Sequence, residues 1–191
     1  MDYLLYRFSA LAPETTNLQL LPEAEQAVAV RKGGNYAIIR TLLRQELARR
    51  SGVPAQDISF SYSEHGKPIF NAQPFNISHS GDLLCMAFHH SCVGVDIERM
   101  RPRRFASLAA RTMCPEQMEA FMERGCQQEE FYSCWCAAEA LVKWAGDTVW
   151  NARLYPFIYH PNRIECLFAN APRVELFSPE QGYMGAVAYT L

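Results

Sequence analysis

The chain has 191 residues, 49% hydrophobic and 12% aromatic, so it can bury a substantial core as one large domain or two closely packed halves. Its 18 lysines and arginines against 20 aspartates and glutamates give a formal charge of −2, which argues against a nucleic-acid-binding protein. No apolar run approaches the roughly 20 residues of a membrane span, and seven cysteines without a Cys-x-x-Cys pair predict reduced thiols in a cytoplasmic protein.

Hydrophobic patterning predicts a first half that begins with a strand and a helical stretch. The strand is expected over residues 2–10, and the helical pattern opens at Pro22. The pattern continues across the glycine pair 33–34 to about Arg50. Three further strands are expected over residues 58–62, 83–89 and 92–98.

The second half repeats this order of helices followed by strands. A helical region starts at Pro102, with breaks at Pro115 and Gly125 where one helix ends and the next begins. Residues 152–191 then alternate between apolar and polar, as strands joined by turns do. We expect one compact unit made of two halves: residues 1–100 and residues 101–191.

Two acidic residues interrupt a run that is otherwise typical of a buried strand. Asp96 and Glu98 lie two residues apart, so on a strand both carboxylates point to the same face. Glu139 and Lys143 lie four residues apart on an apolar helical stretch, which puts them on one helix face. These groups suit a Mg²⁺ ion on a phosphate ester, because a hard cation takes a few protein oxygens and completes its shell with water and phosphate.

The same residues also have simpler interpretations. An acidic pair on a strand most often faces solvent, and a Glu and a Lys at this helical spacing usually form a surface ion pair worth a few tenths of a kcal/mol. The apolar neighbours favour a site instead, because an isolated charge in such surroundings is costly unless a counter-charge or a metal ion meets it.

A third segment carries groups that can bind an anion. Lys67 lies in a Gly-Lys-Pro turn, which leaves its ammonium free to meet a phosphate. Ser78 and His79 lie in a Ser- and Gly-rich stretch that predicts a turn between strands, where hydroxyl, imidazole and backbone N–H groups can approach an anion. Each is weak evidence alone, since a turn lysine is usually solvated and a single histidine is more often structural.

Four short motifs follow one another along the chain: Gly-Lys-Pro (residues 66–68), Asn-Ile-Ser-His-Ser (76–80), Gly-Val-Asp-Ile-Glu (94–98) and Trp-x-x-x-Glu-Ala-x-x-Lys (135–143). This series resembles the 4′-phosphopantetheinyl transferases, and it is similar to their larger monomeric, surfactin-synthetase-activating type. The resemblance implies an α+β fold of two similar halves related by a pseudo-two-fold axis, with the site between them. It also implies a monomer that transfers the phosphopantetheine arm of coenzyme A to a serine of an apo acyl or peptidyl carrier protein.

The resemblance further implies a role for each motif residue. Three carboxylates would be the Mg²⁺ ligands: Asp96, Glu98 and Glu139. Lys143 would meet the phosphates, and Asp96, Glu139 and Lys143 would carry the catalysis, with Glu139 as a candidate base for the carrier serine. The other contacts to coenzyme A would come from Lys67, Ser78, His79 near the 3′-phosphate, and Arg40 on the first helix.

The helix motif departs from the family pattern at two positions. Cys136 and Ala138 stand where the family commonly has a threonine and a lysine, so one positive charge near the phosphates is missing. Loss of one electrostatic contact of several usually slows a reaction without abolishing it, so we expect activity. Two alternatives stay open: a coenzyme A-binding protein with lost turnover, and a metal-dependent phosphoester hydrolase that uses His79.

A cationic and apolar segment lies between the two acidic motifs. Carrier proteins of this kind are typically acidic around the target serine, so this segment is the candidate docking surface. Its members are Arg99, Arg101, Arg103, Arg104, Arg111, Met113, Met118, Phe121 and Met122. The alternative is an amphipathic helix pair that buries its Met and Phe side chains in the core and leaves its arginines in solvent.

Overall fold

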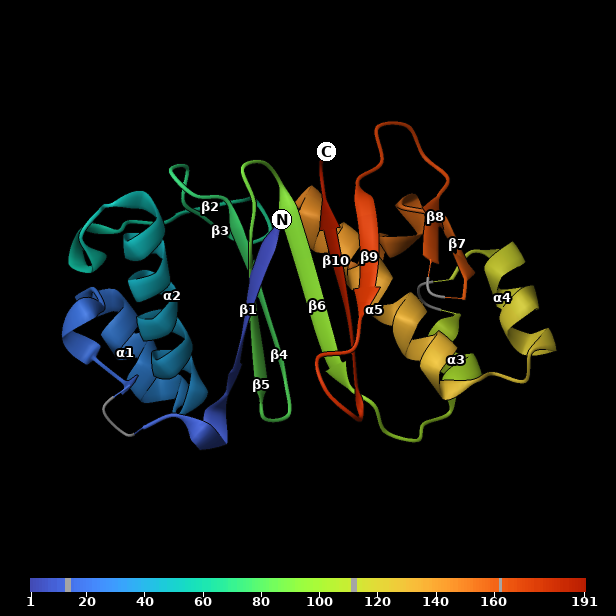
Figure 1. Ribbon diagram of the computed structural model, residues 1–191, viewed down its shortest axis with the longest axis horizontal. Coiled ribbons are helices and arrows are strands. Elements are labelled where there is room, and N and C mark those ends of the chain that lie inside the picture. Colours follow the sequence, from blue (N-terminus) through green and yellow to red (C-terminus); the bar gives the residue numbers. More distant parts are fainter. Residues whose placement is uncertain (13–14, 111–112, 162) are drawn as a thin grey trace.

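Two three-stranded antiparallel sheets form the middle of the protein, with helices at either side (Figure 1). The computed structural model describes residues 1–12, 15–110, 113–161 and 163–191. The first sheet has the order β1-β5-β4 and the second the order β6-β10-β9. Their strands are β1 (Asp2–Arg7), β4 (Phe75–Ser80), β5 (Leu83–Phe88), β6 (Val93–Arg99), β9 (Arg173–Phe177) and β10 (Tyr183–Tyr189).

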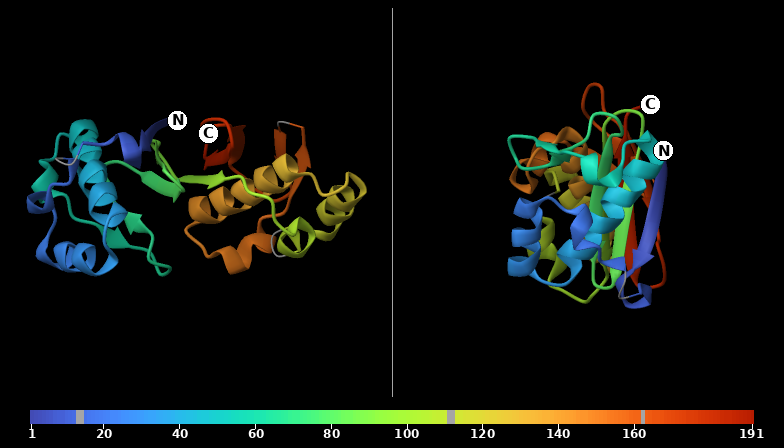
Figure 2. Two further views of the ribbon diagram at one scale, coloured as in Figure 1. Left: turned by 90° about the horizontal axis from the view of Figure 1, so that it is seen from below. Right: turned by 90° about the vertical axis from the view of Figure 1, so that its left-hand side faces the viewer.

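The N-terminal helices and the C-terminal helices lie at opposite ends of the molecule (Figure 2), and each group packs against its own sheet. Those of the N-terminal part are α1 (Glu23–Lys32) and α2 (Asn35–Ser51), and those of the C-terminal part are α3 (Phe105–Ala109), α4 (Pro115–Glu123) and α5 (Gln128–Ala145). Two short hairpins complete the fold: β2 (Ser61–Tyr62) with β3 (Pro68–Ile69), and β7 (Phe157–His160) with β8 (Arg163–Cys166). The predicted α+β class is therefore confirmed.

Strand β5 is buried on both faces, which explains its unbroken apolar sequence. Because side chains alternate along a strand, one set packs toward α2 and the other toward β6 and β10. The first set, Leu84, Met86 and Phe88, packs in one cluster with Leu43 and Leu47 of α2. The second set, Leu83, Cys85 and Ala87, packs in another cluster with Val95 of β6 and Val187 of β10.

The predicted helix breaks at Pro115 and Gly125 are confirmed: a proline opens α4, and Gly125 follows its end with φ +77°. The helical pattern expected to run across Gly33 and Gly34 is divided there into α1 and α2, because the two glycines have φ angles of +71° and +22°, a region that only glycine adopts readily. All seven cysteines are free thiols. In the described parts of the chain, no helix has the length and apolar character needed to cross a membrane.

Three expected elements differ in the structure. The first strand ends at Arg7 and continues as a short 3-10 turn, and the strand expected over residues 58–62 is reduced to β2. The turn predicted around Ser78 and His79 is wrong, because both residues lie on β4. Their polar character misled the prediction: β4 uses polar side chains to bind the neighbouring strand β6. Strand β6, which precedes residue 100, pairs with β10 near the end of the chain. The division into residues 1–100 and 101–191 stays a prediction.

Candidate active site

A glycine brings the two acidic motifs together. Gly94 of β6 lies directly under α5, where an added Cβ atom would sit 2.1 Å from the carbonyl oxygen of Ala140 and 2.3 Å from the amide nitrogen of Trp144. The backbones of strand and helix can approach this closely only because position 94 has no side chain. The role of this glycine is not predicted by the motif alone; a glycine inside a buried strand is the signal that indicates such a close approach.

The contact between β6 and α5 pairs Lys143 with Asp96. The Lys143 ammonium donates to Asp96 Oδ1 at 2.6 Å, to the Val95 carbonyl at 3.2 Å and to Ser78 Oγ at 3.3 Å. All three N–H donors of the ammonium are therefore used. Burial lowers the pKa of Lys143, but the charge and hydrogen bond of Asp96, together with Glu139 and Cys136, raise it, and the net shift is upward.

Asp96 is the most constrained carboxylate of the cluster. It is only 4% exposed, and its Oδ1 accepts from Lys143 and, at 2.8 Å, from Ser78 Oγ. Its second oxygen, Oδ2, is buried and has no hydrogen-bond partner among the described residues. A buried carboxylate oxygen without a donor is unfavourable, so a cation at this point would relieve the cost.

Glu98 and Glu139 supply further negative charge beside Asp96. Burial raises the pKa of Glu98; Asp96 adds to the rise, and the hydrogen bond from Ser80 opposes it. Burial also raises the pKa of Glu139, and the charge of Asp96 is the next cause. In the described residues, no three His, Cys, Asp or Glu side chains already have the arrangement of a metal site. The donor set nevertheless fits a hard divalent cation: it consists of carboxylate oxygens, and one of them is buried without a partner.

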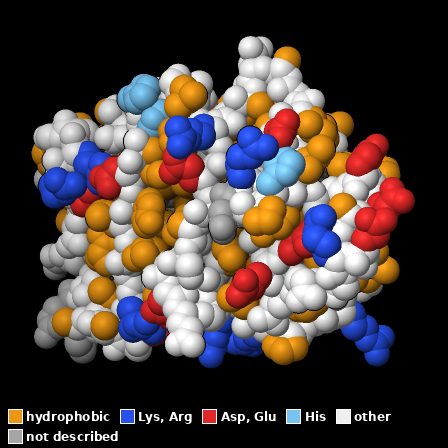
Figure 3. Space-filling model, turned by 45° about the vertical axis from the view of Figure 1, so that its right-hand side comes forward, with side chains coloured by type: hydrophobic (Ala, Val, Ile, Leu, Met, Phe, Trp, Pro, Cys, Tyr) orange, Lys and Arg blue, Asp and Glu red, His pale blue; other side chains and the backbone are white. Residues whose placement is uncertain are grey.

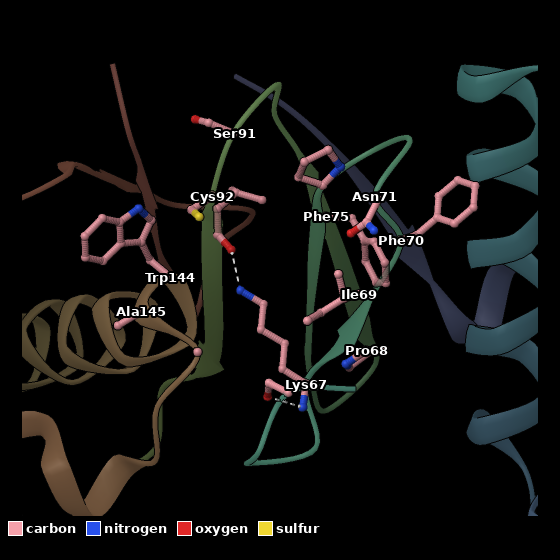
Figure 4. A pocket seen from close by; sticks show the side chains of 14 residues that line it. Lys67, Pro68, Ile69, Phe70, Asn71, Phe75, Ser91, Cys92, Trp144 and Ala145 are labelled. Carbon is pink, nitrogen blue, oxygen red and sulfur yellow. Dashed lines mark hydrogen bonds between the residues drawn. The ribbon is translucent and has the colours of Figure 1, made fainter. Parts of the chain in front are cut away.

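Lys67 reaches across the junction between the two sheets. Its ammonium donates to the Val93 carbonyl at 3.1 Å (Figure 4). It also donates to the Lys143 carbonyl, so the prediction of a free ammonium is wrong. Burial lowers its pKa. A mainly apolar pocket of about 460 Å³ lies on one side of Lys67, with Phe75 and Trp144 in its wall. A second hollow of about 230 Å³, lined by Lys67 and Lys143, borders β4.

Ser78 and His79 point to opposite faces of β4, as neighbouring strand residues do. The Ser78 hydroxyl donates to Asp96 and accepts from Lys143 and, at 3.2 Å, from the Ile97 amide, so its bonding capacity is filled. His79 is exposed and its ring meets Phe8 edge-on, with centroids 6.3 Å apart. Partial burial and the charge of Lys143 lower its pKa.

Arg40 belongs to a different cluster, buried between α1 and α2. Its guanidinium Nε donates to Glu25 Oε2 at 3.1 Å, and its Nη2 forms an ion pair with the other Glu25 oxygen. Arg44 donates to the same carboxylate at 3.1 Å, and both guanidinium groups lie over the Phe60 ring. The structure therefore brings together Asp96, Glu98, Glu139, Lys143, Lys67 and Ser78, while Arg40 is engaged elsewhere. Its contact with coenzyme A stays a prediction.

Replacement of Arg40 by alanine is expected to reduce stability. The change removes charge-assisted hydrogen bonds to Glu25, worth about 2 kcal/mol, while Arg44 still compensates the carboxylate. The free energy of unfolding, measured with urea, should fall by about that amount. An unchanged urea midpoint would mean that the pair with Glu25 does not form in solution and that Arg40 is free for an anion.

Comparisons with known proteins agree with the motif series. Residues 92–182 match the profile of the 4′-phosphopantetheinyl transferase superfamily. A 4′-phosphopantetheinyl transferase of Bacillus subtilis is 34% identical over 110 residues, which cover 55% of this chain and 49% of that protein. The transferase psf-1 of Bacillus pumilus is 32% identical over 117 residues, with 56% of this chain and 50% of that protein covered.

The transferase AcpT of Salmonella typhimurium is 42% identical over 97 residues, which cover 47% of this chain and 50% of that protein. The chain thus spans about half the length of the curated relatives it matches. The matched residues of the superfamily profile include β6 and α5, the two elements that carry the carboxylates and Lys143. The resemblance predicted from the four motifs is confirmed.

Proposed function

Because residues 92–182 match the profile of the 4′-phosphopantetheinyl transferase superfamily, we propose that this chain transfers the phosphopantetheine arm of coenzyme A to a serine of an apo carrier protein. The observation that carries the proposal is the buried Asp96 carboxylate, paired with Lys143 and flanked by Glu98 and Glu139. By the same resemblance the enzyme is a cytoplasmic monomer whose second product is 3′,5′-adenosine bisphosphate.

Lys143 has two tasks in this mechanism. Without substrate it neutralises Asp96, and its three N–H donors are all engaged. A phosphate oxygen of coenzyme A would replace Asp96 as an acceptor of the Lys143 ammonium, which keeps the ammonium paired with an anion and releases Asp96. Asp96, Glu98 and Glu139 would then hold Mg²⁺, which supplies positive charge against the pyrophosphate.

Glu139 is the candidate for the proton transfer. The carrier serine forms a new P–O bond at the β-phosphate while the bond to the adenosine bisphosphate breaks, and the serine proton passes to a carboxylate. Burial and Asp96 raise the pKa of Glu139 above its usual value, which makes its carboxylate a stronger base than a solvated one. In phosphoryl transfer most of the rate comes from position and charge, so no covalent enzyme intermediate is needed.

Ala138, in place of the family's common lysine, is weak evidence against catalytic turnover. Ala138 is 1% exposed and packs in the core around α5. It lies five residues before Lys143, so by helix geometry the two side chains are on different faces. Ala138 therefore leaves the carboxylate and Lys143 arrangement intact, which supports the transferase over a protein that only binds coenzyme A.

Release of 3′,5′-adenosine bisphosphate separates the three functions. The chain is incubated with coenzyme A and Mg²⁺, with and without an apo carrier protein, and the nucleotide is measured by chromatography. A transferase releases it only when the carrier is present, and a carrier with alanine at the target serine abolishes release. Release without carrier would indicate a hydrolase, and binding of coenzyme A without release would indicate a binding protein.

The candidate docking surface is only partly accessible. Phe121 of α4 is buried at 0% exposure, so for it the alternative of an amphipathic helix with a buried face is right. Met113 is also buried, at 3%, but it lies before α4 begins at Pro115. Arg101, Arg103 and Arg104 are exposed, and Met122 is 49% exposed. Arg111 lies outside the described residues. On the face that Figure 3 shows, charged side chains of both signs are scattered among hydrophobic ones. Because the arginines before α3 are exposed, we propose that they provide the cationic contact to an acidic carrier.

Reversal of charge in this segment should slow the capture of an acidic carrier. Arg101→Glu with Arg104→Glu is preferable to a change at Arg103, because Arg103 lines a small hollow with Glu98 and Trp135. We expect the association rate to fall about tenfold at low salt, with less dependence on salt and unchanged affinity for coenzyme A. Arg163→Glu, an exposed change on β8, is the control. Equal carrier kinetics in the double variant and the control would place docking elsewhere.

A further inference from the structure

The two sheets meet along β4 and β6, where side chains replace the usual backbone ladder. Three polar side chains of β4 each accept a backbone N–H of β6: the Val95 amide donates to Asn76 Oδ1 at 2.9 Å, the Ile97 amide to Ser78 Oγ at 3.2 Å, and the Arg99 amide to Ser80 Oγ at 3.1 Å. Each pair is separated by nineteen residues, so the strands run parallel in a constant register. We call Asn76, Ser78 and Ser80 the polar seam.

The seam fixes the direction in which its hydroxyl groups donate. A backbone N–H can only donate, so the oxygen of Ser80 must accept from Arg99. Its single proton is then available for an acceptor, and Glu98 Oε2 lies 2.7 Å away. Ser78 does the same with the Ile97 amide and Asp96. Each serine oxygen thus accepts a hydrogen bond from a backbone N–H of β6, and each serine hydroxyl donates one to the adjacent carboxylate.

We propose that Ser80 is a positioning residue that holds Glu98 for a divalent cation. The inference rests on the proposed function, which uses Glu98 as a metal ligand. Glu98 has no other hydrogen-bond donor among the described residues, so without Ser80 its side chain is free to turn toward solvent. A ligand held by a neighbouring hydrogen bond loses less conformational freedom when it binds a metal, and removal of such a partner typically weakens metal affinity 10- to 100-fold.

Asn76 offers a matched control on the same strand. Like Ser80 it accepts one N–H of β6, but among the described residues its side chain makes no hydrogen bond to Asp96, Glu98 or Glu139. Asn76→Ala and Ser80→Ala each leave one β6 amide without its acceptor, so they weaken the seam in the same way. Only Ser80→Ala also releases Glu98. Ser80→Thr keeps the hydroxyl on a residue that suits a strand, so it should keep the hydrogen bond to Glu98 and the metal affinity.

The experiment measures Mn²⁺ affinity in the absence of coenzyme A and carrier, by the electron paramagnetic resonance signal of free Mn²⁺. We expect Ser80→Ala to bind about tenfold more weakly than the unchanged protein, with Asn76→Ala and Ser80→Thr within about twofold of it. In the transfer assay the Mg²⁺ concentration for half-maximal rate should rise in Ser80→Ala alone, with the rate at saturating Mg²⁺ largely restored.

Equal weakening by Ser80→Ala and Asn76→Ala would show that the seam acts through stability, and it would overturn the positioning role. Equal affinity in all variants would also overturn it. If the protein without substitutions transfers phosphopantetheine but binds no Mn²⁺, these carboxylates do not form a metal site, and the inference about Ser80 is overturned. Absence of transfer by a protein whose Mn²⁺ affinity depends on Ser80 would contradict the proposed function and leave the inference standing.

Discussion

Replacement of Glu139 by glutamine is expected to reduce phosphopantetheine transfer at least a hundredfold while the protein stays folded. Glutamine has nearly the same shape but can neither accept the serine proton nor bind a cation as a carboxylate does. Among the described residues, no side-chain hydrogen bond holds the Glu139 carboxylate, and its favourable charge interaction is with Lys143, which stays paired with Asp96 in the variant. The loss should therefore appear in the rate and not in the stability.

The stability of this variant should even rise slightly. A carboxyl whose pKa is raised in the folded state is less favourable as an anion there than in the unfolded chain, and burial and Asp96 have this effect on Glu139. At pH values above the folded pKa, the neutral amide removes that cost. Glu129→Gln, an exposed change on the same helix, is the control for both measurements. Transfer by Glu139→Gln within threefold of the unchanged protein would remove Glu139 from the catalytic site.

Asp96→Ala should reduce transfer to a similar extent, but its interpretation needs more care. The change removes the anion that neutralises Lys143, whose side chain is 28% exposed, so a loss of stability is expected as well. Glu139→Gln is therefore the cleaner test of catalysis, and Asp96→Ala tests the ion pair between Asp96 and Lys143.

Replacement of Gly94 by alanine should damage both the fold and the site. The added Cβ would lie 2.1 Å and 2.3 Å from backbone atoms of α5, and a helix backbone cannot yield as a flexible side chain does. Overpacking of this kind costs about 3 kcal/mol, which in a domain of this size corresponds to a melting temperature lower by about 10 °C. Glu139 and Lys143 would move away from β6, so transfer at a temperature where the variant is folded should fall at least tenfold.

Circular dichroism gives the melting temperature, and the rate is measured well below it. A melting temperature within 2 °C of the unchanged protein would show that α5 does not rest on Gly94. Normal transfer by a destabilised variant would show that the close approach serves the fold alone.

The acidic strand and the apolar helix were predictable because their signals are local. Asp96 and Glu98 at a spacing of two, and Glu139 and Lys143 at a spacing of four, fix which side chains share a face whatever the fold. The structure then brings the two faces together, as the resemblance to a known family implied. Strand β6 begins and ends one residue later than predicted, and α5 is the helix that follows the predicted break at Gly125.

The errors concern residues whose partners are distant in the chain. Lys67 is bound to carbonyl groups of residues 93 and 143, and the partner of Arg40 is Glu25 on another helix. Ser78 and Ser80 look like turn residues because serine disfavours strands, but here they bind the backbone of β6. Such pairings follow from the tertiary packing, which no local pattern of charges or hydroxyl groups encodes.

The central claim is a Mg²⁺-dependent transfer to a carrier protein, and the intact mass of that carrier tests it most directly. An apo carrier incubated with the chain, coenzyme A and Mg²⁺ should gain the mass of one phosphopantetheine group. The gain should disappear with a chelator, with Glu139→Gln, or with alanine at the carrier serine. An unchanged carrier mass across a panel of apo acyl and peptidyl carriers, with the chain folded and Mg²⁺ in excess, would contradict the account.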